Sequence, residues 1–142
     1  MSMEDPYNLQ RFVTAQAQDY ETALGELRAG RKESHWIWYI FPQVAGLGFS
    51  STAERYAIQS KAEAMAYLEH DVLGARLIEC SATLLRIDGR RIEGIMGSPD
   101  DLKLRSSMTL FKAVSSSGSV FEEVLDKFYS GYEDARTIDF LS

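Results

Sequence analysis

The sequence predicts an all-α fold, a single globular domain over residues 1–142 built as an orthogonal bundle of about six to eight helices. Apolar residues recur at helical spacing along most of the chain, and helix start and stop signals divide it into segments of ordinary helix length. No segment sustains the alternation of period two that is typical of strands. With 45% hydrophobic residues among 142, and with no repeat or linker, the chain can bury one core.

The first helix is predicted to begin at Asp5 and Pro6, as an aspartate N-cap followed by proline at the first helical position. Gly30 is expected to end this helix. Polar residues at Gln16, Gln18 and Asp19 leave open whether this is one bent helix or two short ones.

Residues 35–41 are the weak point of the all-α prediction. The run is rich in aromatic and β-branched side chains, so it fits a strand as well as a helix. Pro42 ends it in either case.

Two helices are predicted in the middle of the chain. Ser60 and Glu63 form a capping box that begins a helix over residues 61–69, with His70 expected in its C-terminal turn. Asp71 is expected to open the next helix, which Gly89 ends. One side of that helix is apolar and should face the core: Val72, Leu73, Leu77, Cys80, Leu84 and Ile87.

The strongest helix start lies at Ser98, predicted as the N-cap, with Pro99 at the first helical position and Asp100 and Asp101 in the first turn. This helix should run to about Val114. A polar loop at residues 115–119 then precedes a helix that ends near residue 131, and a last short helix is expected over residues 135–141.

Composition limits the classes of function. The net charge of −6 disfavours a nonspecific nucleic-acid binder, because neutralising phosphates requires clustered lysine and arginine. The single cysteine, Cys80, forms no internal disulfide and is expected to be a buried apolar residue. No stretch approaches 18 apolar residues and the start lacks the pattern of a secretion signal, so we expect a cytoplasmic protein without a membrane span.

Residues 30–43 and 46–48 resemble the signature of the domain-of-unknown-function 1810 family. The resemblance continues in the same order through residues 8–12, 63–68, 73–77 and 100–111, with Ala15 and Gln16 between. It implies a compact, mostly helical bacterial protein without an assigned activity. It therefore supports the fold prediction and assigns no residue a role.

The first candidate site is a basic and aromatic cluster around residues 35–41. It combines a cation, an imidazole, aromatic faces and an amide, which together suit a ligand with a planar ring and a phosphate. The alternative is that both tryptophans belong to the core and the histidine is satisfied by a hydrogen bond. The cluster comprises Lys32, His35, Trp36, Trp38, Tyr39 and Gln43.

The second candidate is the helix that opens at Ser98. Its two acids suit a proton-transfer or ribose-binding role, and its polar residues could line a pocket wall. The alternative is that the charged residues only pair along the helix surface. The candidates are Asp100, Asp101, Lys103, Arg105, Ser106 and Ser107. The nearby segment 46–51 could cradle a phosphate or form a plain turn, and it lacks the full spacing of a phosphate loop.

These clusters favour a protein that binds or processes a nucleotide-like or ADP-ribose-like molecule. The overall organisation of the chain is similar to that of small helical N-glycosidases. If the protein cleaves a glycosidic bond, the catalytic candidates are His35, Lys32, Asp100 and Asp101. No cofactor is expected, and no metal, since the potential ligands lack useful spacing.

The alternative function is a noncatalytic protein-interaction module, so whether the protein is an enzyme stays open, as does its oligomeric state. A pocket joining His35, Trp36, Lys103 and Ser107 would favour the ligand hypothesis. An exposed apolar patch elsewhere would favour the module.

Overall fold

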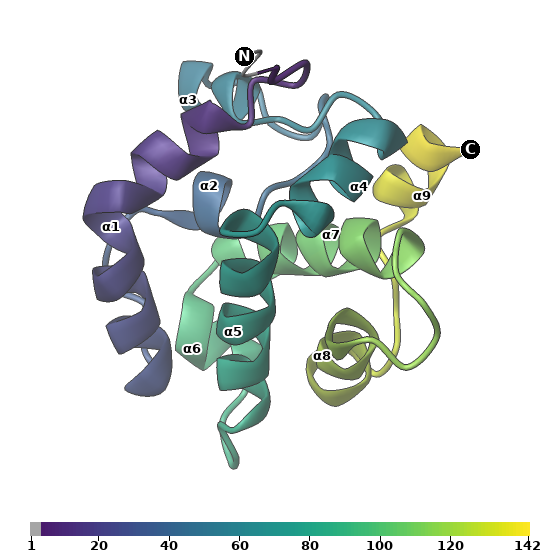
Figure 1. The fold of residues 1–142 in the computed structure, drawn as a ribbon. Helices are drawn as coiled ribbons and strands as arrows, with labels where there is room; N and C mark the ends of the chain where they lie inside the picture. The colour runs from purple at the N-terminus through teal and green to yellow at the C-terminus, as the bar shows by residue number, and fades with distance from the viewer. Residues whose placement is uncertain (1–3) are drawn as a thin grey trace.

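The computed structural model describes residues 4–142, and every helix or strand element in this range is a helix (Figure 1). The predicted all-α fold is therefore confirmed. The helices are α1 (Gln10–Arg28), α2 (Ile37–Ile40), α3 (Ser51–Arg55), α4 (Lys61–Glu69), α5 (Leu73–Leu85), α6 (Ile92–Met96), α7 (Asp100–Ala113), α8 (Val120–Tyr129) and α9 (Ala135–Leu141). The expected six to eight become nine in the described range, because α3 and α6 have five residues each and are too short to show a period.

Two helices organise the packing. α5 lies at the centre and packs on α1, α4 and α8, while α7 runs across it and contacts α6, α8 and α9 (Figure 1). Aromatic rings link the layers through the core. Phe12 of α1 meets Tyr67 of α4 edge to face at 5.0 Å between ring centroids, Tyr67 meets Phe111 of α7 at 5.4 Å, and Phe111 meets Phe121 of α8 at 5.8 Å.

The start of α1 differs from the prediction. The N-cap residue is Leu9 and not Asp5, although the Asp5 carboxylate accepts from the backbone N–H groups of Leu9 and Gln10, at 2.8 and 2.9 Å. The helix consequently begins at Gln10, and Pro6 lies outside it. From there α1 is one continuous helix, and Gly30 follows its end with a φ of 75°.

The turn between α4 and α5 also corrects a prediction. The Ser60 hydroxyl accepts from Glu63 N–H as expected. His70 follows α4 as predicted, but its Nδ1 also accepts from the backbone N–H groups of Val72 and Leu73. Val72 is the N-cap residue of α5, and the side chain that accepts from the first N–H groups is His70 and not Asp71. The predicted core face of α5 is buried at Leu73, Leu77, Cys80 and Leu84, whereas Val72 is 38% exposed.

The same turn requires a glycine. A Cβ on Gly74 would lie 2.0 Å from the carbonyl oxygen of Leu68. The first turn of α5 can approach the end of α4 this closely only because residue 74 has no side chain.

α7 begins one residue later than predicted, at Asp100 in place of Pro99. Pro99 occupies the N-cap position, after a cis Ser98–Pro99 peptide, and no side chain accepts a hydrogen bond there. The prediction that Ser98 caps the helix is therefore wrong. Asp100 and Asp101 do lie in the first turn, where their charge complements the helix dipole.

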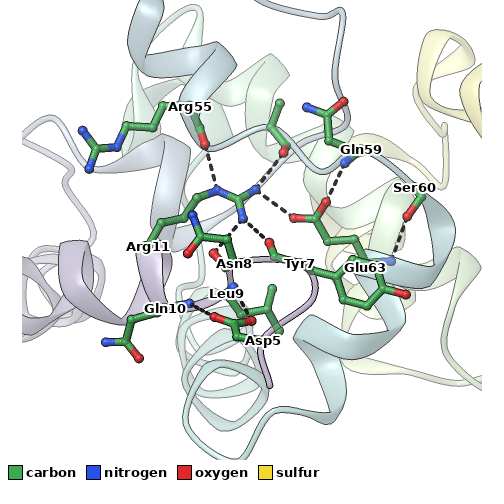
Figure 2. A network of polar contacts seen from close by, with 11 residues as sticks. Asp5, Tyr7, Asn8, Leu9, Gln10, Arg11, Arg55, Gln59, Ser60 and Glu63 are labelled. Atoms are coloured by element: carbon green, nitrogen blue, oxygen red, sulfur yellow. Dashed lines mark hydrogen bonds and ion pairs between the residues drawn. The ribbon is translucent and has the colours of Figure 1, made fainter. Parts of the chain in front are cut away.

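Arg11 ties three segments of the chain together (Figure 2). Its side chain is largely buried, and it donates only to backbone carbonyls and to one carboxylate among the described residues. Each nitrogen of the guanidinium is engaged, so Arg11 reads as structural. The acceptors are the carbonyls of Tyr7, Asn8, Arg55 and Ala57 and the Glu63 carboxylate, at 2.7 to 2.9 Å.

Residues 35–41 contain no strand, and their central part, Ile37–Ile40, forms the single-turn helix α2. The chain then meets a distant segment at an isolated parallel bridge between Val44 and Ile58. Ile58 N–H donates to the Gln43 carbonyl at 2.8 Å, and Ala45 N–H donates to the Ile58 carbonyl at 2.9 Å. This bridge holds the segment after α2 beside the segment after α3.

Candidate small-molecule binding site

Two adjoining hollows share three lining residues, Gln43, Leu47 and Lys103. We call them the ring hollow and the arginine hollow, and together the Lys103 groove. The ring hollow, of about 250 Å³, is lined in addition by Trp38, Val44, Gly48, Phe49, Ser50, Ala53, Tyr56 and Ala57. The arginine hollow, of about 450 Å³, is lined in addition by Pro99, Leu102, Arg105, Ser106, Asp134 and Arg136.

The wall of the ring hollow comes from α2, α3 and the loop between them. α2 carries Trp38, and the Val44–Ile58 bridge sets the position of Gln43. The loop closes tightly on α3, because a Cβ on Gly48 would lie 2.8 Å from the Cβ of Ala53. Phe49, at the rim, is 82% exposed.

Lys103 stands at the junction of the two hollows. It lies on α7, and its Nζ is 5.3 Å from the centroid of the Trp38 ring. The same ammonium lies 3.6 Å from Asp100 Oδ1, one turn earlier on the helix. The groove thus has a partly exposed cation beside an aromatic face.

Lys32 lies behind this junction. Its side chain is only 5% exposed and its Nζ is 2.7 Å from Asp100 Oδ2. The same ammonium donates to the Ser34 carbonyl and lies 4.8 Å from the centroid of a Trp36 ring. Asp100 therefore lies between two lysines, one buried and one on the groove.

The cations of the arginine hollow are oriented by backbone carbonyls. Arg105 donates from Nε to Tyr132 and from Nη2 to Glu133, at 3.1 and 2.7 Å. Arg136, on α9, donates from Nη2 to the Gly46 carbonyl at 3.0 Å. A carbonyl orients a guanidinium without neutralising it, so both keep their charge for a ligand.

The carboxylate on this hollow is already engaged. Asp134 Oδ2 accepts from the Ser106 hydroxyl at 2.9 Å and from the N–H and hydroxyl of Thr137 at the start of α9. Its role is to cap α9 and join that helix to α7.

Two aromatic candidates lie outside the groove. Trp36 is 1% exposed, and its Nε1–H donates to Glu26 Oε1 at 2.9 Å. The Tyr39 hydroxyl donates to the Asp19 carboxylate. Burial, and then that hydrogen bond to an acid, raise the pKa of Tyr39 above its ordinary value. Of the aromatic candidates, Trp38 alone lines the groove.

Three further candidates line neither hollow. His35 is exposed on the surface. Asp101 and Ser107 are buried in α7, and within residues 4–142 Asp101 Oδ1 and Ser107 Oγ have no hydrogen-bond partner. The structure thus does not bring His35, Trp36, Lys103 and Ser107 into one pocket. It brings together Trp38, Gln43, Lys103, Arg105 and Ser106.

Sequence reasoning missed Glu26, which organises the loop before α2. Burial by itself raises the pKa of Glu26, but hydrogen bonds from the Ser34 hydroxyl, the Glu33 and Ser34 N–H groups and Trp36 outweigh it and lower that pKa to about 2. No spacing in the sequence indicates this contact.

The groove residues that were missed come from separate segments. Phe49 and Ser50 are not among them, because they lie in the segment 46–51 that the sequence suggests as a phosphate cradle or, more strongly, as a plain turn. Tyr56, Leu102 and Arg136 carry no local signal, because only the fold brings them to the groove.

A family model described as protein of unknown function (DUF1810) matches residues 6–141. The chain belongs to the DUF1810 family. The resemblance seen at residues 30–43 is therefore confirmed. A similar solved structure, that of the conserved hypothetical protein Rv1873 from Mycobacterium tuberculosis, is 53% identical, with a TM-score of 0.95 over 96% of this chain and 98% of that one. No curated protein matches this DUF1810 chain.

The described part of this DUF1810 protein has no helix both long and apolar enough to cross a membrane. Among the same residues, no three histidine, cysteine or acidic side chains are grouped so as to hold a metal ion.

Proposed function

We propose that this DUF1810 protein binds an anionic small molecule with a planar ring, of the nucleotide-like or ADP-ribose-like class, in the Lys103 groove. The observation that carries the proposal is the position of Lys103. Its ammonium lies at the wall shared by both hollows, 5.3 Å from the Trp38 ring centroid. A ligand that stacks near Trp38 would place an attached anionic group against this cation.

The charge of the groove supports an anionic ligand. The whole chain has a net charge of −6. In the groove and directly behind it, four cations, Lys32, Lys103, Arg105 and Arg136, face two carboxylates, Asp100 and Asp134. A positive hollow on an acidic protein concentrates anions locally, and the acidic surroundings repel large polyanions such as nucleic acids.

The proposal is for binding rather than for glycosidic chemistry. N-glycosidase-type catalysis would require a carboxylate beside the sugar. Asp100 and Asp101 line neither hollow, and Asp134 is engaged in capping α9. Lys103 therefore supports recognition, and no group in the groove is an evident acid or nucleophile.

A calorimetric and thermal-shift comparison of two lysine variants tests the proposal. Lys103→Met should lose binding of nucleotides found in a screen of nucleosides, nucleotides and sugar phosphates. Lys112→Met is the matched control, because Lys112 lies on the same helix with 31% side-chain exposure against 32% for Lys103, and it lines neither hollow.

Equal binding by both variants would contradict the proposal. A screen without any ligand would also contradict it and would favour the protein-interaction module.

A further inference from the structure

The two hollows of the Lys103 groove differ sharply in chemistry. The ring hollow has three aromatic side chains, Trp38, Phe49 and Tyr56, and no arginine or carboxylate. The arginine hollow has two arginines and no aromatic ring. A symmetrical or wholly polar ligand would use only half of such a groove, so the asymmetry indicates a ligand with one aromatic and one anionic end.

We propose that the ligand is a nucleoside diphosphate or a derivative of one, with its base in the ring hollow and its diphosphate in the arginine hollow. This inference rests on the proposed function and adds to it the number of phosphates and the direction of binding.

The order of the cations along the groove indicates two phosphates. Lys103 is shared by both hollows and lies beside the Trp38 ring, so it meets the phosphate nearest the sugar. Arg105 and Arg136 line only the arginine hollow and would meet a second phosphate beyond the first. A nucleoside monophosphate would leave these two guanidiniums without an anionic partner.

The arginines still have donors for that second phosphate. Arg105 Nη1 makes no hydrogen bond among the described residues, and the same holds for Arg136 Nε and Nη1. In residues 4–142, no carboxylate lies within ion-pair distance of either guanidinium, and the carbonyls that hold them reduce their freedom before a ligand arrives.

The residues shared by the hollows suit the sugar between base and phosphates. Gln43 lines both hollows, and its side-chain amide makes no hydrogen bond within the described range, whereas its backbone carbonyl is fixed by Ile58 N–H at 2.8 Å. An amide can donate to and accept from ribose hydroxyls. The two hollows, of about 250 and 450 Å³, also have the combined size of a small-molecule site.

Isothermal titration calorimetry with adenosine, AMP, ADP and inorganic pyrophosphate tests this order of groups. ADP should bind at least tenfold more tightly than AMP and than pyrophosphate, because only ADP fills both hollows. GDP, CDP and UDP are included, since the ring hollow sets no evident choice of base.

A variant pair tests the direction of binding. Arg136→Gln should remove the preference for ADP over AMP while leaving AMP binding within about twofold. Arg91→Gln, which alters an arginine of 89% exposure outside the groove, should leave that preference intact. Circular dichroism and Tm should be unchanged in both variants, since Arg136 is also exposed.

Equal affinity for AMP and ADP, or an unchanged preference in Arg136→Gln, would overturn the diphosphate inference and leave the binding proposal standing. Pyrophosphate binding as tight as ADP would overturn both, because the ring would then contribute nothing to affinity. Failure of all four nucleoside diphosphates and of AMP to bind would overturn both.

Discussion

Lys32 and Asp100 form an ion pair, with Nζ 2.7 Å from Oδ2, that joins the loop after α1 to the first turn of α7. The lysine is almost fully buried, whereas the aspartate is 19% exposed and also faces Lys103. The Asp100 carboxylate thus pairs with a buried lysine inside the fold and with a second lysine at the edge of the groove.

Asp100→Asn should lower the free energy of unfolding by about 2 to 3 kcal/mol. This loss is smaller than the loss expected when a fully buried ion pair is broken, because Asp100 retains some contact with water. Urea denaturation measures it. Glu93→Gln, in the exposed pair with Arg91, is the control and should cost less than about 0.5 kcal/mol.

The double variant Lys32→Met with Asp100→Asn should lose less stability than the sum of the two single variants, because it leaves no buried charge unpaired. Strict additivity would show that the two side chains are not coupled.

Gly74→Ala should destabilise the protein by roughly 1 to 3 kcal/mol or more, because its Cβ would lie 2.0 Å from a backbone oxygen that cannot move freely. Gly25→Ala is the matched control. Gly25 is exposed inside α1 and an added Cβ meets nothing within 4 Å, so this change should stabilise by about 0.5 to 1 kcal/mol. Equal effects of the two substitutions on thermal unfolding would refute the close approach.

Glu26 should make stability depend on pH in the acid range. The pKa of Glu26 is lowered from 4.5 to about 2 in the folded state. Its contribution is therefore fully present above about pH 4.5 and is lost as the pH falls toward 2. The difference in unfolding free energy between wild type and Glu26→Gln should shrink over this interval. Glu21→Gln, an exposed change on the same helix, is the comparison, and a difference for Glu26→Gln that stays constant with pH would contradict the prediction.

Phe49→Ala should weaken binding of a ring-bearing ligand by about fivefold or more, since stacking of a base on an aromatic side chain contributes roughly 1 to 3 kcal/mol. Because Phe49 is 82% exposed, the substitution should change the free energy of unfolding of the protein by less than about 0.5 kcal/mol. Met65→Ala, at 45% exposure on α4, provides a comparison outside the groove. Unchanged affinity in Phe49→Ala would remove this residue from the site.

The fold could be predicted where local signals act over short distances. The Ser60 cap and the apolar face of α5 depend on residues three or four apart, which is the range that periodicity and capping describe. The start of α1 could not be predicted in this way, because the Asp5 carboxylate accepts from N–H groups four and five residues away. The cap of α5 was missed because an imidazole nitrogen replaces the usual aspartate.

The site was predictable only in part. Trp36 and Trp38 cannot be distinguished in the sequence. In the structure Trp36 is buried in the core, where its Nε1–H donates to Glu26 on α1, whereas Trp38 lines the groove. Lys103 could be proposed from its charge on the predicted helix. Arg136 could not, because it is held at the groove by a hydrogen bond to Gly46, which lies 90 residues earlier in the chain. Such a contact depends on the packing of α9 on α7, which no local pattern encodes.

The hydrogen bond from Arg136 to Gly46 also couples the groove to the docking of α9, because it joins that helix to the loop after α2 across 90 residues of the chain. A ligand that needs Arg136 would bind only molecules in which α9 is docked. Its binding would therefore oppose local unfolding of α9, in addition to stabilising the protein as a whole.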